Sequence, residues 1–90
     1  MLQIEYRNIF KKDLERAKKR GKDLEKLKNI IRLLVDGQTL PSKLRDHPLT
    51  GNYKDRRECH IESNWLLIYK KGNDSIIFER TGTHSDLFGS

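Results

Sequence analysis

Three histidines, His47, His60 and His84, are the residues of this 90-residue chain with the most evident capacity for chemistry. Histidine is the side chain that can both donate and accept a proton near neutral pH. The three lie in different stretches, one before Pro48, one in a long charged segment and one after the turn at residues 81–83. A fold that brings them together would supply an acid and a base to the same substrate.

RNA is a substrate that such a set could cleave, because its 2′-hydroxyl is an internal nucleophile. Cleavage needs a base for that hydroxyl, an acid for the departing 5′-oxygen and cations for the charge that develops on the phosphorus centre. Arg57, Arg80 and nearby lysines are candidates for the cations. DNA lacks the 2′-hydroxyl, so this route is closed to it.

A metal site is the first alternative use for the histidines. No His-x-His or His-x3-His pair occurs, and the acids near the histidines do not stand at ligand spacing. The sequence therefore predicts no metal and no other cofactor. Cys59 is the only cysteine, which excludes an internal disulfide and a thiolate cluster. Because it lies in a strand-like stretch, we expect it to be a small buried filler.

The charge of the chain indicates the kind of partner. The net charge is +6 and the pI is near 9.6, which favours nucleic acid or an acidic protein. Residues 1–36 hold 11 Lys and Arg against 6 Asp and Glu, so most of the excess is N-terminal. For any single lysine, solvation of a helix is the simpler explanation. With no long apolar run and no leader pattern, we expect a cytoplasmic protein without membrane association.

Two amphipathic helices come first among the elements that must position the histidines. Residues 8–20 place Phe10, Leu14 and Ala17 on one face, and residues 23–36 carry a broader apolar stripe. Gly21 separates them, and such a short break predicts two roughly antiparallel, packed helices.

Strands account for most of the remaining chain. Apolar alternation and turn residues predict strands at residues 2–6, 44–47, 53–62, 65–70 and 75–80, with one helical turn beginning at His84. We therefore expect one α+β domain over residues 1–90. Its two N-terminal helices should cover one face of a single, mostly antiparallel sheet and leave the other face open.

Three motifs follow these helices in a specific order. They are DHPL at residues 46–49, RECHIESNWLLIYK at residues 57–70 and FERTGTHSDLF at residues 78–88. Each piece alone is a weak signal, but the ordered set resembles the YafQ branch of the RelE superfamily of bacterial toxins, and the likeness spans nearly the whole chain. It implies a RelE-like microbial ribonuclease fold.

The resemblance also implies a function. The family consists of toxins of type II toxin–antitoxin systems, which cut mRNA in the ribosomal A site and so inhibit translation. The implied reaction is attack by the 2′-hydroxyl, leaving a 2′,3′-cyclic phosphate and a 5′-hydroxyl. The implied partner is an acidic antitoxin of the DinJ/RelB type with a ribbon-helix-helix part, so operator DNA would be bound only through the antitoxin complex.

Carried over by position, the resemblance implies a set of site residues. The catalytic candidates are His47, His60, His84 and Glu58, and the substrate-binding candidates are Asp46, Arg57, Asn64, Arg80 and Phe88. His84 is the expected general acid, while the sequence leaves base and phosphate-binding roles undivided between His60 and His47. Phe88, one helical turn after His84, is expected to stack on a base.

Asn64 departs from the family pattern, which usually has aspartate there. Asparagine can form hydrogen bonds but cannot take a proton at neutral pH. Two other functions remain open from the residues alone. One is a non-catalytic basic module that blocks the ribosome by occupancy. The other is a DNA-binding regulator, which is disfavoured because no helix-turn-helix pattern is visible.

Overall fold

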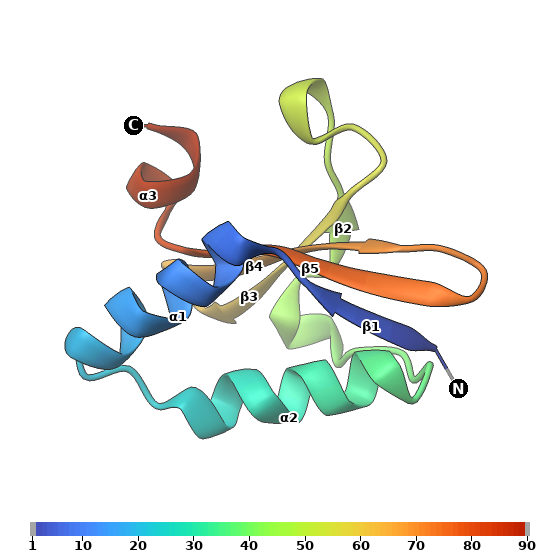
Figure 1. Ribbon diagram of the computed structural model, residues 1–90, viewed down its shortest axis with the longest axis horizontal. Helices are drawn as coiled ribbons and strands as arrows, with labels where there is room; N and C mark the ends of the chain where they lie inside the picture. Colours follow the sequence, from blue (N-terminus) through green and yellow to red (C-terminus); the bar gives the residue numbers. More distant parts are fainter. Residues whose placement is uncertain (1, 90) are drawn as a thin grey trace.

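The elements follow one another in the order of an α+β protein (Figure 1). The computed structural model describes residues 2–89. Its helices are α1 (Asn8–Lys19), α2 (Leu24–Val35) and α3 (His84–Phe88), and its strands are β1 (Gln3–Tyr6), β2 (His47–Pro48), β3 (Arg57–Glu62), β4 (Trp65–Lys71) and β5 (Ser75–Gly82). Two short 3-10 turns, η1 (Ser42–Leu44) and η2 (Gly51–Tyr53), lie on either side of β2.

The described strands form one sheet in the order β1-β5-β4-β3-β2. β1 runs parallel to β5, and the other neighbouring pairs are antiparallel. This confirms the expected single, mostly antiparallel sheet. The parallel edge arises because the chain leaves β1 through α1 and α2 before it returns to the sheet.

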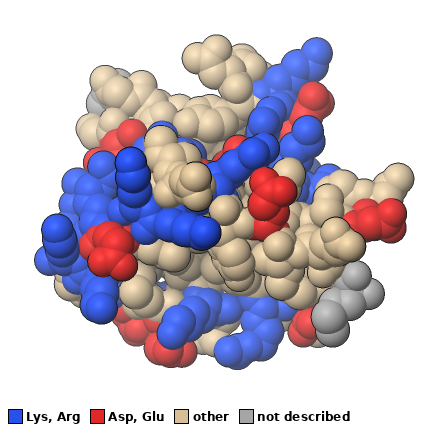
Figure 2. All heavy atoms as spheres, in the orientation of Figure 1, with Lys and Arg blue, Asp and Glu red and all other residues tan. Residues whose placement is uncertain are grey.

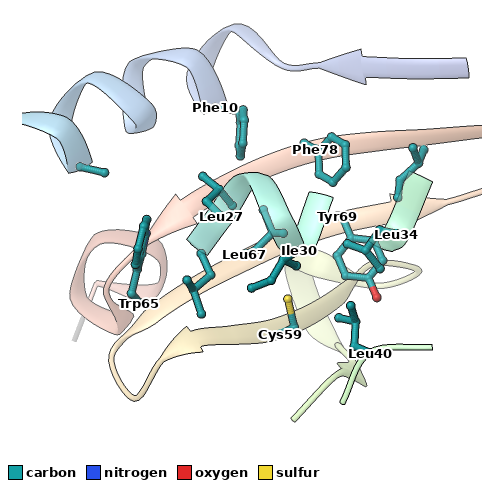
Figure 3. Close-up of a cluster of buried hydrophobic side chains, with 13 residues drawn as sticks. Phe10, Leu27, Ile30, Leu34, Leu40, Cys59, Trp65, Leu67, Tyr69 and Phe78 are labelled. Carbon is teal, nitrogen blue, oxygen red and sulfur yellow. The ribbon is translucent and has the colours of Figure 1, made fainter. Parts of the chain in front are cut away.

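The main core lies between the sheet and the two long helices (Figure 3). Phe10 from α1 and Leu27 from α2 meet Trp65 and Leu67 from β4 in this cluster. Cys59 is fully buried there, and burial is the main cause that raises the pKa of its thiol to about 12. It is therefore a neutral packing residue, as expected, because only a thiolate is an effective nucleophile.

The opposite face of the sheet carries a smaller apolar cluster. Leu66 and Ile68 of β4 pack there against Leu87 of α3. The short helix α3 thus covers part of the face that α1 and α2 leave open. It follows the end of β5 and lies on the other side of the sheet from α2 (Figure 1).

Two predicted strands are wrong in extent. Of residues 44–47 only His47 lies in a strand, because η1 occupies Ser42–Leu44 and Arg45 takes a left-handed φ of 51°. The strand predicted from Tyr53 begins only at Arg57, since Tyr53 belongs to η2. β2 has two residues, one of which is Pro48, and proline cannot donate to a sheet.

The helices also differ from the packed pair that the sequence suggested. They share one core, but α1 packs mainly along β5 and α2 along β3. Lys and Arg side chains gather over α1 and its turn into α2, at the left of the view in Figure 2. Within residues 2–89, no helix is long and apolar enough to cross a membrane.

Candidate active site

Strand register brings the first group of site residues onto one face. Glu58 on β3 lies opposite His47 on β2 and Ile68 on β4, and Ile68 lies opposite Arg80 on β5. The register shifts between β4 and β5 at Glu79, which is an extra residue in β5. Without this bulge, strand alternation would turn Arg80 toward the main core.

A second row of residues lies two positions further along β3. His60 is opposite Leu66, and Leu66 is opposite Gly82 at the end of β5. His84 follows Gly82 by two residues and begins α3. The histidines that are far apart in sequence are therefore adjacent because their strands are neighbours in the sheet.

Glu58 joins His47 and His60. One carboxylate oxygen, Oε1, lies 3.2 Å from Nε2 of His47 and 3.3 Å from Nε2 of His60. Glu58 is only 4% exposed, so the two imidazoles are its main source of compensation for lost water. The His47 contact is a hydrogen bond, whereas His60 approaches the carboxylate without forming one.

The remaining nitrogens distinguish the two histidines. Nδ1 of His47 lies 3.1 Å from the carbonyl oxygen of Pro48, so both of its nitrogens face acceptors. That geometry suits the imidazolium cation. Among residues 2–89, Nδ1 of His60 has no hydrogen-bond partner, which distinguishes it from Nδ1 of His47.

Asn64 fixes the orientation of His84. Its Oδ1 accepts a hydrogen bond from the backbone N–H of His84 at 3.0 Å and lies 2.8 Å from Nδ1 of the same residue. A backbone N–H can only donate, so the contacting atom of Asn64 is its oxygen, and Nδ1 of His84 must carry a proton. Nε2 of His84 is therefore the ring nitrogen left to face a substrate, and it has a proton to give when the ring is the imidazolium cation.

Four aromatic rings form a line across this face. The ring centroids of His47 and His60 are 6.3 Å apart, those of His60 and His84 5.9 Å, and those of His84 and Phe88 6.3 Å. Phe88 is 42% exposed and meets the edge of Tyr53 at 5.7 Å. The ring of His84 therefore lies between those of His60 and Phe88.

Asp13 of α1 holds Arg80 at the border of the site. Its carboxylate accepts from Nε of Arg80 at 2.8 Å, from Arg16 at 2.7 Å and from the backbone N–H of Thr81 at 3.1 Å. The hydrogen bond that Arg80 donates to Asp13, opposed by burial, raises the pKa of Arg80, and Tyr53 adds to this effect. β1 does not pair with this end of β5. Asp13 therefore accepts the backbone hydrogen bond that a neighbouring strand would otherwise have accepted.

Asp46 and Arg57 lie apart from the histidines, so their role in substrate binding stays a prediction. Arg57 lies opposite Tyr69, whose ring belongs to the main core, so both are on the helix-covered face. Asp46 accepts from the Tyr69 hydroxyl at 2.6 Å and from Nε of Arg57 at 3.3 Å. These residues anchor the segment that precedes His47.

The absence of a bound metal stays a prediction, although the fold brings three potential metal ligands together. His47, Glu58 and His60 offer ligand atoms that all lie within 4.8 Å of one another. Two imidazoles and a carboxylate are a donor set that fits a transition metal. Sequence spacing did not show this set, because its members come from two neighbouring strands.

Two contributors to the site were missed by the sequence reasoning, namely Asp13 and Tyr53. A usable signal existed for Asp13, because it shares the buried face of α1 with Phe10 and Ala17. An acid on an apolar helix face is rarely buried without a partner. Tyr53 was assigned to a strand, which concealed its position beside Phe88.

A mostly antiparallel sheet with two helices on one face and a histidine cluster on the other defines the class of RelE-like bacterial toxins. The chain matches the family described as "Bacterial toxin of type II toxin-antitoxin system, YafQ" over residues 2–89. It belongs to that family.

Individual relatives agree with this assignment. The chain is 47% identical over 87 residues to the mRNA interferase toxin YafQ of Escherichia coli K12, covering 96% of this chain and 95% of that protein. It superposes on YafQ in the E. coli DinJ–YafQ complex with a TM-score of 0.94 and 46% identity, covering 99% and 100% of the two chains. A metal-bound toxin from Helicobacter pylori matches with a TM-score of 0.90 and 41% identity, covering 98% and 100%.

Proposed function

We propose that this chain is a ribosome-dependent mRNA interferase that cleaves mRNA in the A site and thereby inhibits translation in the cytoplasm. The observation that carries the proposal is the line of histidine rings on one face, with Glu58 and Asn64 fixing their donors and acceptors. Family membership supports the same function, because the E. coli relative is an mRNA interferase.

The geometry supports a distinct role for each histidine. Nδ1 of His60 would take the proton of the 2′-hydroxyl, whose oxygen then attacks the adjacent phosphorus. His47 as imidazolium and Arg80 would stabilise the charge on the phosphoryl oxygens. Nε2 of His84 would give its proton to the leaving 5′-oxygen, which leaves a 2′,3′-cyclic phosphate and a 5′-hydroxyl. The 5.9 Å between the rings of His60 and His84 lets the two groups flank one phosphate.

Binding roles extend beyond the histidines. Phe88 would stack on a base of the A-site codon, because it is exposed beside His84. The basic surface over α1 would hold the ribosomal RNA backbone without reading sequence. The partner would be an acidic antitoxin, as DinJ is the partner of YafQ in the E. coli complex. Operator DNA would be bound only through that complex.

Primer extension on mRNA from a translating extract tests cleavage against simple occupancy. We expect wild-type protein to give new 5′ ends within the A-site codon. Translation inhibited while the message stays intact would overturn the proposal and favour a basic module that blocks the ribosome.

Metal removal tests the acid–base character of the reaction. If chemistry is carried by His60 and His84, a pre-treatment of the toxin with EDTA, followed by buffer exchange before ribosomes are added, should leave the cleavage rate unchanged. Added Zn²⁺ should inhibit, because a metal held by His47, Glu58 and His60 would engage the His60 ring that must accept the proton. Activity lost to EDTA and restored by Zn²⁺ would contradict the assignment.

A further inference from the structure

The helix α3 carries two proposed site residues but has little apolar packing of its own. It spans only His84–Phe88, and of its residues only Leu87 is buried. A single turn of helix at a chain end is not stable by itself. The position of His84 therefore depends on polar contacts that hold α3 to the rest of the molecule.

One such contact joins α3 to the end of α1. Nη1 of Arg20 lies 2.6 Å from Oδ2 of Asp86, and Nη2 lies 3.2 Å from Oδ1, which is a two-pronged guanidinium–carboxylate pair. The Asp86 side chain is 12% exposed, and Arg16 adds a second cation at 4.0 Å. The bond from Arg20 holds the pKa of Asp86 well below its usual range, so the carboxylate is ionised at neutral pH.

The same carboxylate also forms the first turn of α3. Oδ2 of Asp86 accepts from the backbone N–H of Thr83 at 2.9 Å, and Oγ1 of Thr83 accepts from the backbone N–H of Asp86 at 3.1 Å. These reciprocal bonds are a capping box. A Cβ at Gly82 would lie 2.9 Å from Cβ of Asp86, so glycine is required for this close approach.

We propose that Arg20 and Asp86 are positioning residues for His84 and Phe88. The pair sets the direction in which α3 leaves β5 and so fixes the distance from the His84 ring to the His60 ring. Neither residue contacts the proposed reacting atoms. The catalytic consequence rests on the function proposed above, whereas the structural consequence does not.

The pair is expected to matter more for catalysis than for global stability. The Arg20 side chain is largely exposed, and exposed ion pairs contribute little to folding. A displacement of about 1 Å in a reacting group can nevertheless cost about a hundredfold in rate. Loss of the pair should therefore lower kcat while the protein stays folded.

A double-mutant cycle on ribosome-bound mRNA tests the proposal. Arg20→Gln and Asp86→Asn should each lower kcat by about ten- to a hundredfold, with a smaller change in KM. The double variant should lose no more than the larger single loss, because both changes break one contact. Glu5→Gln, which neutralises an acid of an exposed ion pair on β1, is the matched control and should keep wild-type kcat.

Two results of this experiment would contradict the positioning role. If Arg20 acts only by contacting ribosomal RNA, Arg20→Gln raises KM and Asp86→Asn has no effect, which would overturn the proposal. Additive losses in the double variant would overturn it too.

Amide exchange measured by NMR tests the structural part without any catalytic readout. The N–H of His84, bonded to Asn64, and the N–H of Gly89, bonded to the carbonyl of Ser85, should exchange at least about tenfold faster in Asp86→Asn than in wild type or Glu5→Gln. Unchanged exchange would refute the positioning role even if wild-type protein cleaves no RNA. Faster exchange in a protein that cleaves no RNA would support positioning and contradict only the proposed function.

Discussion

His84→Ala is expected to lose about 10²- to 10⁴-fold in mRNA cleavage rate, the usual contribution of a positioned general acid. The variant removes the Nε2 proton that would go to the leaving 5′-oxygen, while Asn64 keeps its bond to the backbone N–H of residue 84. The measurement is single-turnover cleavage of mRNA on programmed ribosomes.

His60→Ala should show a loss of similar size, because it removes the proposed base. The double variant should lose less than the product of the two single losses, since groups that act in one step are not additive. Thermal unfolding should change little for His84→Ala, because His84 is exposed. Cleavage within a few-fold of wild type in His84→Ala would refute its role as the acid.

Asp13→Ala is expected to have the largest effect on stability, a loss of about 3–5 kcal/mol in the free energy of unfolding. The change removes the acceptor of four hydrogen bonds and leaves Arg80 without its charge partner and the Thr81 N–H buried and unpaired. At roughly 4 °C or more per kcal/mol for a domain of this size, the melting temperature should fall by more than about 12 °C.

Urea unfolding at neutral pH gives the comparison. Glu15→Ala removes an exposed acid from the same helix and should stay within about 0.5 kcal/mol of wild type. Asp13→Asn keeps the size of the side chain. Its free energy of unfolding should lie between those of Asp13→Ala and Glu15→Ala. An Asp13→Ala variant as stable as Glu15→Ala would show that the buried network contributes nothing to folding.

Periodicity was sufficient to predict the long elements. The apolar faces of α1 and α2 recur at helical spacing, and Asp23 caps α2 by accepting from the N–H of Glu25. The segment between α2 and β3 carried no such pattern. Its course depends on Arg45 and Gly51 at positive φ and on tertiary contacts to β3, which local propensity does not encode.

The three histidines of the cluster could be predicted from the sequence, but the partners of their ring nitrogens could not. Motif order placed His47, His60 and His84 in one site, whereas the roles proposed for them rest on the partners of each ring nitrogen. The position of Arg57, apart from the histidines, has a simple reason. Arg57 and buried Cys59 are two residues apart on β3, so their side chains point to the same face of the sheet. His60 points to the opposite face.

The bulge at Glu79 shows the limit of that alternation. Counting from buried Phe78 would place Arg80 in the core, yet the bulge turns Arg80 to the catalytic face. A one-residue insertion in a strand leaves no mark in the apolar pattern when the following residues are polar or small. The partner of Arg80, Asp13, is 67 residues away in the chain and is brought near only by the fold.

A single 2′-deoxy substitution tests the central claim, that the 2′-hydroxyl of the message is the nucleophile activated by the histidine cluster. The measurement is cleavage of an mRNA bound to programmed ribosomes, with deoxyribose only at the nucleotide 5′ to the scissile phosphate. We expect wild-type protein to cut the all-ribose message to a 2′,3′-cyclic phosphate and a 5′-hydroxyl, and to leave the substituted message intact at that position. Cleavage of the substituted message at the same bond and rate would contradict the mechanism.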